Sequence, residues 1–341
     1  MQLDEIIIML GEQSAERVKM NNEPVESYKF SYAFQQQLMK SWRPKPTLKC
    51  AITIYVIIGL IFFALGIAIL IESNQIFEQQ IRYDDSCTTI GQNCTVTFTI
   101  GAQVTQPIYF FYRITSFYQN QRRYVQSISY PQLSGQTYNS SVFYSSCDPV
   151  QTNADLFTTT SMPDANGVTY PLIPASSAFP CGLVARSLFN DTFTLTLQGS
   201  STIIPMSAKG IAWPDDINYR YFNLPANQSQ YQWTDIQSER FMNWMKMSPF
   251  SDFRKTWGII QVNLAAGTYQ VNIANNWNAN IFGGQKWIVL STTNSFGGAN
   301  YFLAYSYLAI GGLSILCAIV FIVRKITRPK GVLDKKIREF S

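Results

Sequence analysis

Two long stretches of the sequence contain no charged residue. Residues 51–71 read AITIYVIIGLIFFALGIAILI, and residues 302–323 read FLAYSYLAIGGLSILCAIVFIV. At about 1.5 Å per residue, helices over these stretches are about 32 Å long, close to the hydrocarbon thickness of a bilayer. The pattern predicts two transmembrane helices. The first stretch is too long, and too far from the N-terminus, for a cleaved signal peptide, so we interpret it as an uncleaved signal anchor.

The segment between these helices follows a period of two. Short runs of β-branched and aromatic residues are separated by Gly, Pro, Asn and Ser, which predicts strands joined by turns. The expected strands are residues 94–100, 108–114, 192–197, 268–273 and 287–291. We predict one mainly antiparallel, sandwich-like β domain, large enough to bury a core.

Two segments of this domain have helical periodicity instead. In residues 117–128, helical spacing places five side chains on one face: Phe117, Tyr118, Tyr124, Val125 and Ile128. In residues 238–247, the shared face holds Phe241, Trp244 and Met245, and the helix is expected to end before Pro249. We therefore expect short helices within the β domain.

The basic residues orient the two membrane helices, because cytosolic ends carry an excess of Lys and Arg. Such residues precede the first helix and follow the second: Lys40, Arg43, Lys45, Lys49, Arg324, Lys325, Arg328 and Lys330. We predict a cytosolic tail (1–50), a helix (51–71), an exoplasmic β-rich domain (72–301), a second helix (302–323) and a second cytosolic tail (324–341). The net charge of +5 arises in the tails. Attraction to anionic lipid explains it, and nucleic acid is not needed.

Glycosylation sequences and cysteines fit this topology. N-x-S/T sequences lie in residues 72–301 and not in the tails, so we expect N-glycosylation at Asn93, Asn139, Asn190 and Asn227. Four of the six cysteines lie there too, as expected in an oxidising compartment: Cys87, Cys94, Cys147 and Cys181. The sequence permits three pairings, of which we choose Cys87 with Cys94 and Cys147 with Cys181. Cys50 is interpreted as a free thiol, with palmitoylation as the alternative, and Cys317 as a packing residue.

The residues that most enzyme chemistry needs are missing. The chain has no histidine, which removes Ser–His and Cys–His nucleophile pairs and the commonest zinc ligand. It contains neither GxxxxGK[ST] nor GxGxxG. Two charged groups remain: Asp215 and Asp216, interpreted as solvated or capping acids, and Asp252, Arg254 and Lys255, interpreted as a surface cluster. We predict a non-catalytic protein with no cofactor or metal site of its own.

The predicted membrane helices carry no Asp, Glu, Lys, Arg or His, which argues against an ion or proton path through this chain alone. Small residues recur in them at a spacing of seven: Gly59 and Gly66 in the first, and Ala304, Gly311 and Ala318 in the second. Such a stripe lets another backbone approach closely. Either the two helices pack on each other, or a larger membrane protein docks there. The stripes alone do not separate these interpretations.

The cytosolic segment before the first helix combines aromatic residues with Trp42, Pro44 and Pro46. The prolines favour an extended chain where it approaches the membrane. The segment is explained either as an interfacial anchor, with Trp42 at headgroup depth, or as a contact for a partner. Both interpretations stay open.

Six stretches, in order from about residue 34 to residue 312, resemble one family. They are FQQQLMKSWRPKPT, FYQNQRRYVQS, PCGLVARSLFNDTFTL, GIAWPDDI, SPFSDFRKTWGII, and the region from GTYQVNIANNWNANIFGGQKW to SFGGANYFLAYSYLAIGG. They are similar to motifs of the cell division control protein 50 family, also called ligand-effect modulator 3. Departures are Gln121 for a histidine, Ala299 for a lysine, Tyr301 for a proline, and fewer cysteines near the first strand.

The resemblance implies a non-catalytic β-subunit of a type IV P-type ATPase, which moves phospholipids from the exoplasmic to the cytosolic leaflet. In such a heterodimer the catalytic α-subunit carries ATP and Mg²⁺. The β-subunit supports its folding, its exit from the endoplasmic reticulum and its conformational states. The expected location is the endoplasmic reticulum, the Golgi and endosomal membranes or the plasma membrane.

A different class of protein shares this topology. Trimeric ligand-gated channels also have two membrane helices, cytosolic ends and a disulfide-bonded, glycosylated loop. They carry many more ectodomain cysteines, and polar pore positions that are missing here. A channel subunit is therefore the alternative, and a stand-alone ectoenzyme is more distant.

We expect contacts with the ATPase on three sides. The cytosolic arm offers Trp42, Pro44 and Pro46, the membrane helices offer Gly59, Gly66, Gly311 and Gly312, and the ectodomain offers Arg122 and Arg123. For the two arginines the leading interpretation is internal, with salt bridges and carbonyl contacts in the ectodomain. Contact with the ATPase's exoplasmic loops or with lipid headgroups is the alternative.

Overall fold

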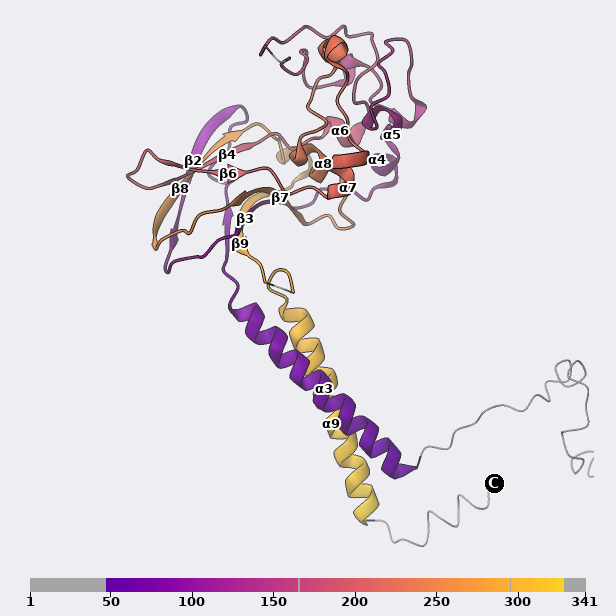
Figure 1. Ribbon diagram of the computed structural model, residues 1–341, viewed down its shortest axis with the longest axis vertical. Coiled ribbons are helices and arrows are strands. Elements are labelled where there is room, and N and C mark those ends of the chain that lie inside the picture. Colours follow the sequence, from indigo (N-terminus) through magenta and orange to yellow (C-terminus); the bar gives the residue numbers. More distant parts are fainter. Residues whose placement is uncertain (1–46, 165, 295, 328–341) are drawn as a thin grey trace, which may run out of the picture. The chain divides into compact units, whose positions relative to one another are not determined.

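The computed structural model describes residues 47–164, 166–294 and 296–327 (Figure 1). Two long apolar helices begin and end this part of the chain, α3 (Leu48–Asn74) and α9 (Tyr301–Thr327). Each is long enough to cross a membrane, and only 17% of its most apolar window is buried inside the protein. Apolar side chains left uncovered in this way suit a lipid environment. The prediction of two apolar helices on either side of the β domain is confirmed.

The described chain divides into two compact units. One comprises residues 47–61 and 311–327, and the other comprises residues 62–310. The helices pair in both: Tyr55 lies 5.6 Å from Phe321 between ring centroids in the first unit, and Phe62 stacks on Tyr307 at 5.1 Å in the second. Aromatic contacts thus join α3 to α9 at more than one level.

The strands of the second unit form two antiparallel sheets (Figure 1). The first has the order β1 (Glu78–Arg82), β9 (Lys286–Thr292), β3 (Ile108–Ile114), β7 (Phe253–Ile260), β6 (Met206–Ser207). The second has the order β2 (Gln92–Ile100), β8 (Gly267–Asn275), β4 (Thr192–Leu197), β5 (Ile203–Ile204). The predicted antiparallel β domain is confirmed, and β3 and β4 have the predicted bounds.

The two sheets meet through large apolar side chains. Along β3, alternate residues are buried (Ile108, Phe110, Tyr112 and Ile114) while the residues between them are half-buried. This is the period of two that a strand with one inward face requires. The Phe110 ring on β3 lies 5.2 Å from the Phe193 ring on β4. Because β3 and β4 belong to different sheets, this contact is part of the core of a sandwich.

Four strands were not predicted: β1, β5, β6 and β7. β1 reads EQQIR and lies at the edge of its sheet, where polar side chains face solvent. β7 reads FRKTWGII, and its two adjacent basic residues, Arg254 and Lys255, hide the apolar alternation. β5 and β6 have only two residues each, too few to give a period.

Short helices interrupt the strands. They are α4 (Arg122–Gln126), α5 (Tyr130–Leu133), α6 (Leu183–Arg186), α7 (Pro214–Tyr219) and α8 (Glu239–Met245), with 3-10 turns η2 (Ser145–Cys147), η3 (Asn153–Asp155), η4 (Ala226–Tyr231) and η5 (Asn280–Phe282). Figure 1 shows α4–α8 grouped to one side of the strands. α8 confirms the helix expected in residues 238–247, and its predicted apolar face, Phe241, Trp244 and Met245, is buried.

The helix expected over residues 117–128 is shorter than predicted. Gln121 caps α4, its side chain accepting a hydrogen bond from the Tyr124 backbone N–H, so the preceding residues are not helical. Tyr124 and Phe117 do pack together, with ring centroids 5.6 Å apart. Tyr118 and Val125 do not join them, because their side chains are 62% and 36% exposed. The prediction of one continuous apolar face is therefore wrong.

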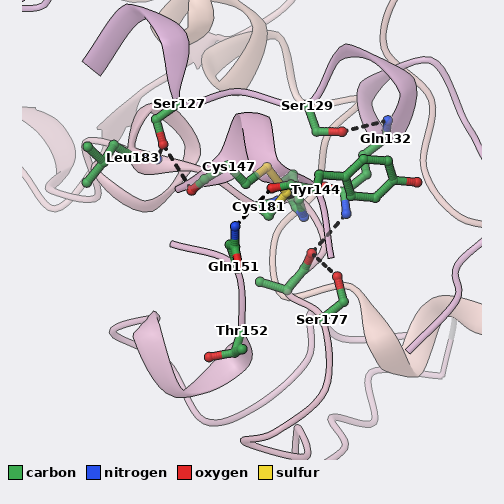
Figure 2. The surroundings of a disulfide bond; sticks show 12 residues. Ser127, Ser129, Gln132, Tyr144, Cys147, Gln151, Thr152, Ser177, Cys181 and Leu183 are labelled. Carbon is green, nitrogen blue, oxygen red and sulfur yellow. Dashed lines mark hydrogen bonds between the residues drawn. A yellow bond between two sulfur atoms is a disulfide. The ribbon is translucent and has the colours of Figure 1, made fainter. Parts of the chain in front are cut away.

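Both disulfides have the chosen pairing, Cys87 with Cys94 and Cys147 with Cys181. Figure 2 shows the second bond, which lies in a closely hydrogen-bonded region. Ser127 Oγ donates to the Cys147 carbonyl at 3.1 Å and accepts from the Leu183 N–H at 2.8 Å. One hydroxyl thus connects the segment after α4 to both sides of the disulfide.

Gly182, next to this disulfide, has a conformation that only glycine adopts readily. Its φ is +102° and its ψ is 157°, a region closed to residues that carry a Cβ. A Cβ built there would lie 2.3 Å from the Ser127 carbonyl oxygen. The chain of residues 180–183 can approach residue 127 so closely only because this side chain is absent.

Candidate functional site

The small-residue stripes of α3 and α9 are filled by the two helices themselves. A Cβ built on Gly59 would lie 2.7 Å from Ile315 Cγ1 and 3.2 Å from the Gly311 carbonyl oxygen. A Cβ on Gly66 would lie 2.8 Å from Leu308 Cγ. Of the two interpretations left open, packing of the helices on each other is the one observed at these glycines. Gly59, Gly66 and Gly311 therefore lack room to receive a helix of another protein.

Gly312, the next residue of α9, has no such neighbour. It is exposed, and a Cβ built on it would meet nothing within 4 Å. Next to it, Leu313 and Leu316 are 62% and 55% exposed. This outward face is apolar and uncharged, with a gap at Gly312 where another backbone can approach. Of the four glycines named from the sequence, Gly312 alone has open space beside it.

The arginine pair Arg122 and Arg123 is exposed to solvent. Arg122 and Arg123 begin α4, and neither forms an ion pair or side-chain hydrogen bond with any residue in the described ranges. The expectation of salt bridges and carbonyl contacts inside the ectodomain is therefore wrong. α4 turns Tyr124 inward, where its hydroxyl lies 2.7 Å from Ser187 Oγ, and leaves the two guanidinium groups in solvent.

A buried ion pair lies between the sheets, where the sequence analysis had placed no site. Lys286 Nζ lies 2.7 Å from Asp191 Oδ2, and the two side chains are 2% and 0% exposed. The Tyr83 hydroxyl donates to the same oxygen at 2.6 Å. The other oxygen of Asp191 accepts the backbone N–H groups of Asn276 and Trp277, both at 2.6 Å. Each carboxylate oxygen is thus satisfied, as a buried charge requires.

Contacts within this network also set the protonation states of its members. Burial lowers the pKa of Lys286, and the neighbouring Asp191 opposes that shift. Burial and the same carboxylate raise the pKa of Tyr83 well above its ordinary value, so the phenol stays a neutral donor. The group is closed by its own partners, and its chemical role is to hold β1, β4, β8 and β9 together. The sequence did carry a signal, since Asp191 and Lys286 lie within the motif stretches FNDTF and FGGQK.

Lys255 contradicts the surface cluster predicted for its segment. Its side chain is buried, and its Nζ donates to the carbonyl oxygens of Asn243, Trp244 and Lys246 at the end of α8. The ammonium thus satisfies carbonyls that a helix C-terminus leaves without partners. Burial lowers the pKa of Lys255 to about 7. Asp252 and Arg254 do lie nearer the surface, where Asp252 pairs with Arg113.

The acids of GIAWPDDI divide between surface and interior. Asp215 is exposed, as expected, whereas Asp216 is buried and lies 2.8 Å from Lys246 Nζ. The prediction of a solvated or capping acid is therefore wrong for Asp216, which anchors α7 to the end of α8. Within the described ranges, no group of three or more His, Cys, Asp or Glu is placed to hold a metal ion.

The remaining predicted positions are either exposed or outside the described ranges. All four sequon asparagines, Asn93, Asn139, Asn190 and Asn227, have exposed side chains that a glycosyl group can reach. Cys50 is a free, exposed thiol and Cys317 a free, half-buried one. The arm residues Trp42, Pro44 and Pro46 lie outside the described residues.

Comparison with known proteins identifies the family. The model of the LEM3 (ligand-effect modulator 3) family, or CDC50 family, matches residues 69–331. This range includes the end of α3, the whole β domain and the whole of α9. The chain belongs to this family. The resemblance found in the six sequence motifs is confirmed.

Relatives from distant organisms match nearly the full length. The ALA-interacting subunit 3 of Arabidopsis thaliana is 31% identical over 328 residues, covering 88% of this chain and 87% of that protein. The cell cycle control protein 50A of Bos taurus is 31% identical, covering 85% and 87%. The phospholipid-transporting ATPase accessory subunit CRF1 of Saccharomyces cerevisiae is 25% identical, covering 91% and 88%.

The motif stretches of this CDC50-family chain mostly hold the ectodomain together. Glu239 Oε2 accepts the backbone N–H groups of Ile211 and Ala212, so α8 fixes the GIAW segment. Asn120 Nδ2 donates to the Pro249 carbonyl, which joins the arginine-bearing segment to the loop after α8. The exposed members of these stretches, Arg122 and Arg123 above all, take no part in this internal packing and remain available for a partner.

Proposed function

We propose that this chain is the non-catalytic accessory β-subunit of a phospholipid-transporting type IV P-type ATPase. The observation that carries the proposal is membership of the CDC50 family over residues 69–331, with a near-full-length relative that is itself named an accessory subunit of such an ATPase. In this role the chain contributes to transport of phospholipid from the exoplasmic to the cytosolic leaflet. It does so by supporting the folding, export and conformational states of the catalytic subunit.

ATP and Mg²⁺ belong to the catalytic subunit in this proposal. Three buried charged groups of the described ectodomain already have partners within the chain: Lys286 pairs with Asp191, Asp216 pairs with Lys246, and Lys255 donates to backbone carbonyls. They are arranged to hold strands and helices together, and no substrate-binding arrangement emerges from them. A stabilising subunit fits this chemistry.

We further propose the topology that the basic residues indicate. Residues 1–50 and 324–341 are cytosolic, residues 51–71 and 302–323 cross the bilayer, and residues 72–301 are exoplasmic and glycosylated. Two observations support this arrangement: the two disulfides and the four exposed sequon asparagines all lie in residues 72–301. The complex would reside in the endoplasmic reticulum, the Golgi and endosomal membranes or the plasma membrane.

The partner contacts are proposed on three surfaces. In the membrane, the open face around Gly312 receives a helix of the ATPase, since Gly59, Gly66 and Gly311 are occupied by α3 and α9. In the ectodomain, Arg122 and Arg123 face the ATPase's exoplasmic loops. On the cytosolic side, Trp42, Pro44 and Pro46 form an arm along the ATPase.

Affinity purification of the full chain, followed by mass spectrometry, tests the proposal. We expect a P-type ATPase to co-purify in stoichiometric amount, and reconstituted vesicles of the pair to move labelled phospholipid when ATP is supplied. Isolation of the chain as a homo-oligomer without an ATPase would instead support the ligand-gated channel, to which the family and its relatives give no support. Hydrolytic or ion-conducting activity of the purified chain alone would also overturn the proposal.

A further inference from the structure

A pocket of about 840 Å³ opens in the ectodomain, within the size range of ligand sites. Its walls are mainly large apolar side chains, contributed by loops far apart in the sequence. They include Phe117, Phe157, Trp233, Trp277, Ile281 and Phe282. Phe157 and Ile281 at its margin are 78% and 77% exposed, although both are residues that normally pack inside. Exposed apolar side chains gathered in this way are typical of a surface that binds a ligand or a partner.

The polar groups of the pocket restrict what that occupant can be. Among the described residues, Arg186 is the only charged one that lines it, and its guanidinium stacks on the Phe157 ring, 4.1 Å from the centroid. Its Nε is buried and makes no hydrogen bond to the described residues. A suitable occupant has flat apolar faces to cover the rings and oxygen atoms to accept from Arg186. A chain of hexoses, which has C–H faces and hydroxyl and acetamido oxygens, has both.

The chain carries an attachment point for such an occupant on the wall of the pocket itself. Asn190 begins the sequence Asn-Asp-Thr, lines the pocket and has an exposed side chain. Its backbone carbonyl accepts a hydrogen bond from Asn276 Nδ2, while its own side-chain amide makes none to the described residues. The other sequons, at Asn93, Asn139 and Asn227, are not among the residues that line this pocket.

We propose that an N-linked oligosaccharide on Asn190 folds back into this pocket and covers Phe157, Ile281 and the Arg186 guanidinium. Attachment joins the Asn190 Nδ2 to the anomeric carbon of an oligosaccharide carried on a lipid diphosphate. The diphosphate leaves with the bonding electron pair, and the amide nitrogen loses one proton. The inference rests on the proposed exoplasmic location of residues 72–301. It adds that this glycan is part of the packed ectodomain, unlike a glycan that extends freely into solvent.

Peptide N-glycosidase acting on the native, glycosylated full chain tests this directly. We expect it to release the Asn190 glycan at least ten times more slowly than the Asn139 glycan, because the linkage is covered. In a Phe157→Ala/Ile281→Ala double variant, the Asn190 rate should rise toward the Asn139 rate. Both side chains are largely exposed, so the variant should fold. An Ile203→Ala variant, which removes a 61% exposed side chain on β5, is the matched control and should change neither rate.

A thermal double-mutant cycle gives an independent reading. Asn190→Gln should lower the melting temperature, and adding Phe157→Ala/Ile281→Ala should lower it little further, because the glycan contacts are already lost. Asn139→Gln with Ile203→Ala should be additive. Equal release rates for the two glycans in the isolated chain, or strict additivity at Asn190, would overturn the inference. Slow release that occurs only in the complex with the ATPase would assign the pocket to the partner and also overturn it.

Glycan mapping separates failure of this inference from failure of the proposed topology. If Asn190 is bare while other sequons are modified, the pocket inference is wrong and the exoplasmic location stands. If none of the four sequons carries a glycan in a glycosylating host, the exoplasmic location itself is overturned, and the pocket inference with it.

Discussion

Lys286 Nζ and Asp191 Oδ2 lie 2.7 Å apart in an environment that excludes water almost completely. Lys286 starts β9 and Asp191 directly precedes β4, so the pair joins the two sheets. Removing one member leaves the other charge buried and uncompensated, which typically costs about 3–5 kcal/mol. We therefore expect Lys286→Met to lower the free energy of unfolding by about this amount, measured by thermal or denaturant unfolding of the purified chain.

The matched control is Glu78→Gln, which breaks the partly exposed pair of Glu78 with Arg254. Exposed pairs contribute at most about 1 kcal/mol, because solvent screens both charges. If Lys286→Met and Glu78→Gln destabilised the chain equally, the buried pair would have no special role in holding the sheets.

Replacement of Gly182 by alanine should prevent correct folding of the region around the second disulfide. The new Cβ would lie 2.3 Å from the Ser127 carbonyl oxygen, so the backbone would have to shift. Gly199→Ala separates this clash from simple backbone strain, because Gly199 also has a positive φ, +81°, but nothing within 4 Å. Strain alone costs about 1–3 kcal/mol. We expect Gly182→Ala to be retained in the endoplasmic reticulum, measured by glycan maturation, and Gly199→Ala to exit.

Leucine at Gly59 and leucine at Gly312 should have opposite effects. At Gly59 the side chain would collide with Ile315 and force α3 away from α9. Cross-linking between cysteines introduced at Tyr55 and Phe321, whose rings are 5.6 Å apart, should then decrease. Gly312→Leu should leave this cross-linking unchanged and reduce co-purification of the ATPase. Unchanged co-purification would remove the face around Gly312 from the proposed interface.

The buried amine of Lys255 should make stability depend on pH near neutrality. Burial lowers its pKa from 10.5 to about 7 in the folded chain. Between these values the unfolded chain binds the extra proton, so the free energy of unfolding should rise with pH, by at most about 1.4 kcal/mol per pH unit. The chain has no histidine to obscure this window. Unfolding curves from pH 6 to 9.5 should show the slope, and Lys255→Met should reduce it, leaving the part that belongs to Lys286, whose pKa burial also lowers. Parallel curves for the two proteins would contradict the assignment.

The sequence predicted those elements whose signal is local. β3 and β4 matched because alternating apolar residues along one strand are enough to indicate it. β7 was not predicted because Lys255 occupies a buried position of the strand, although a charged residue normally indicates an exposed one. Its partners, the carbonyls of residues 243–246, come from a different element. No pattern within FRKTWGII records that such acceptors exist nearby.

The candidate site was likewise predictable from the sequence only where its signal was local. The spacing of Gly59 and Gly66 identified a close-packing face. It did not show whether the other membrane helix of this chain or a helix of another protein packs there, because both need small residues. Only the position of Leu308 and Ile315 decided between them. Likewise, Arg122 and Arg123 were not among the residues that helical spacing placed on the face of Tyr124. The tertiary fold decides whether an acidic side chain lies close enough to pair with these arginines. Within the described residues, none does.

That absence gives the clearest test of a partner contact. Because Arg122 and Arg123 form no ion pair or side-chain hydrogen bond in the described ranges, Arg122→Ala/Arg123→Ala should change the free energy of unfolding by no more than about 0.5 kcal/mol. Glycan maturation of the isolated chain should also be normal. If the guanidinium groups meet acidic groups of the ATPase, association should weaken and become less sensitive to salt, and lipid transport should fall. The control is Arg220→Ala on α7, whose side chain is 64% exposed but adjacent to Asp216. Normal transport by the double variant would exclude these arginines from the interface, whereas loss of stability would restore the internal role that the sequence first suggested.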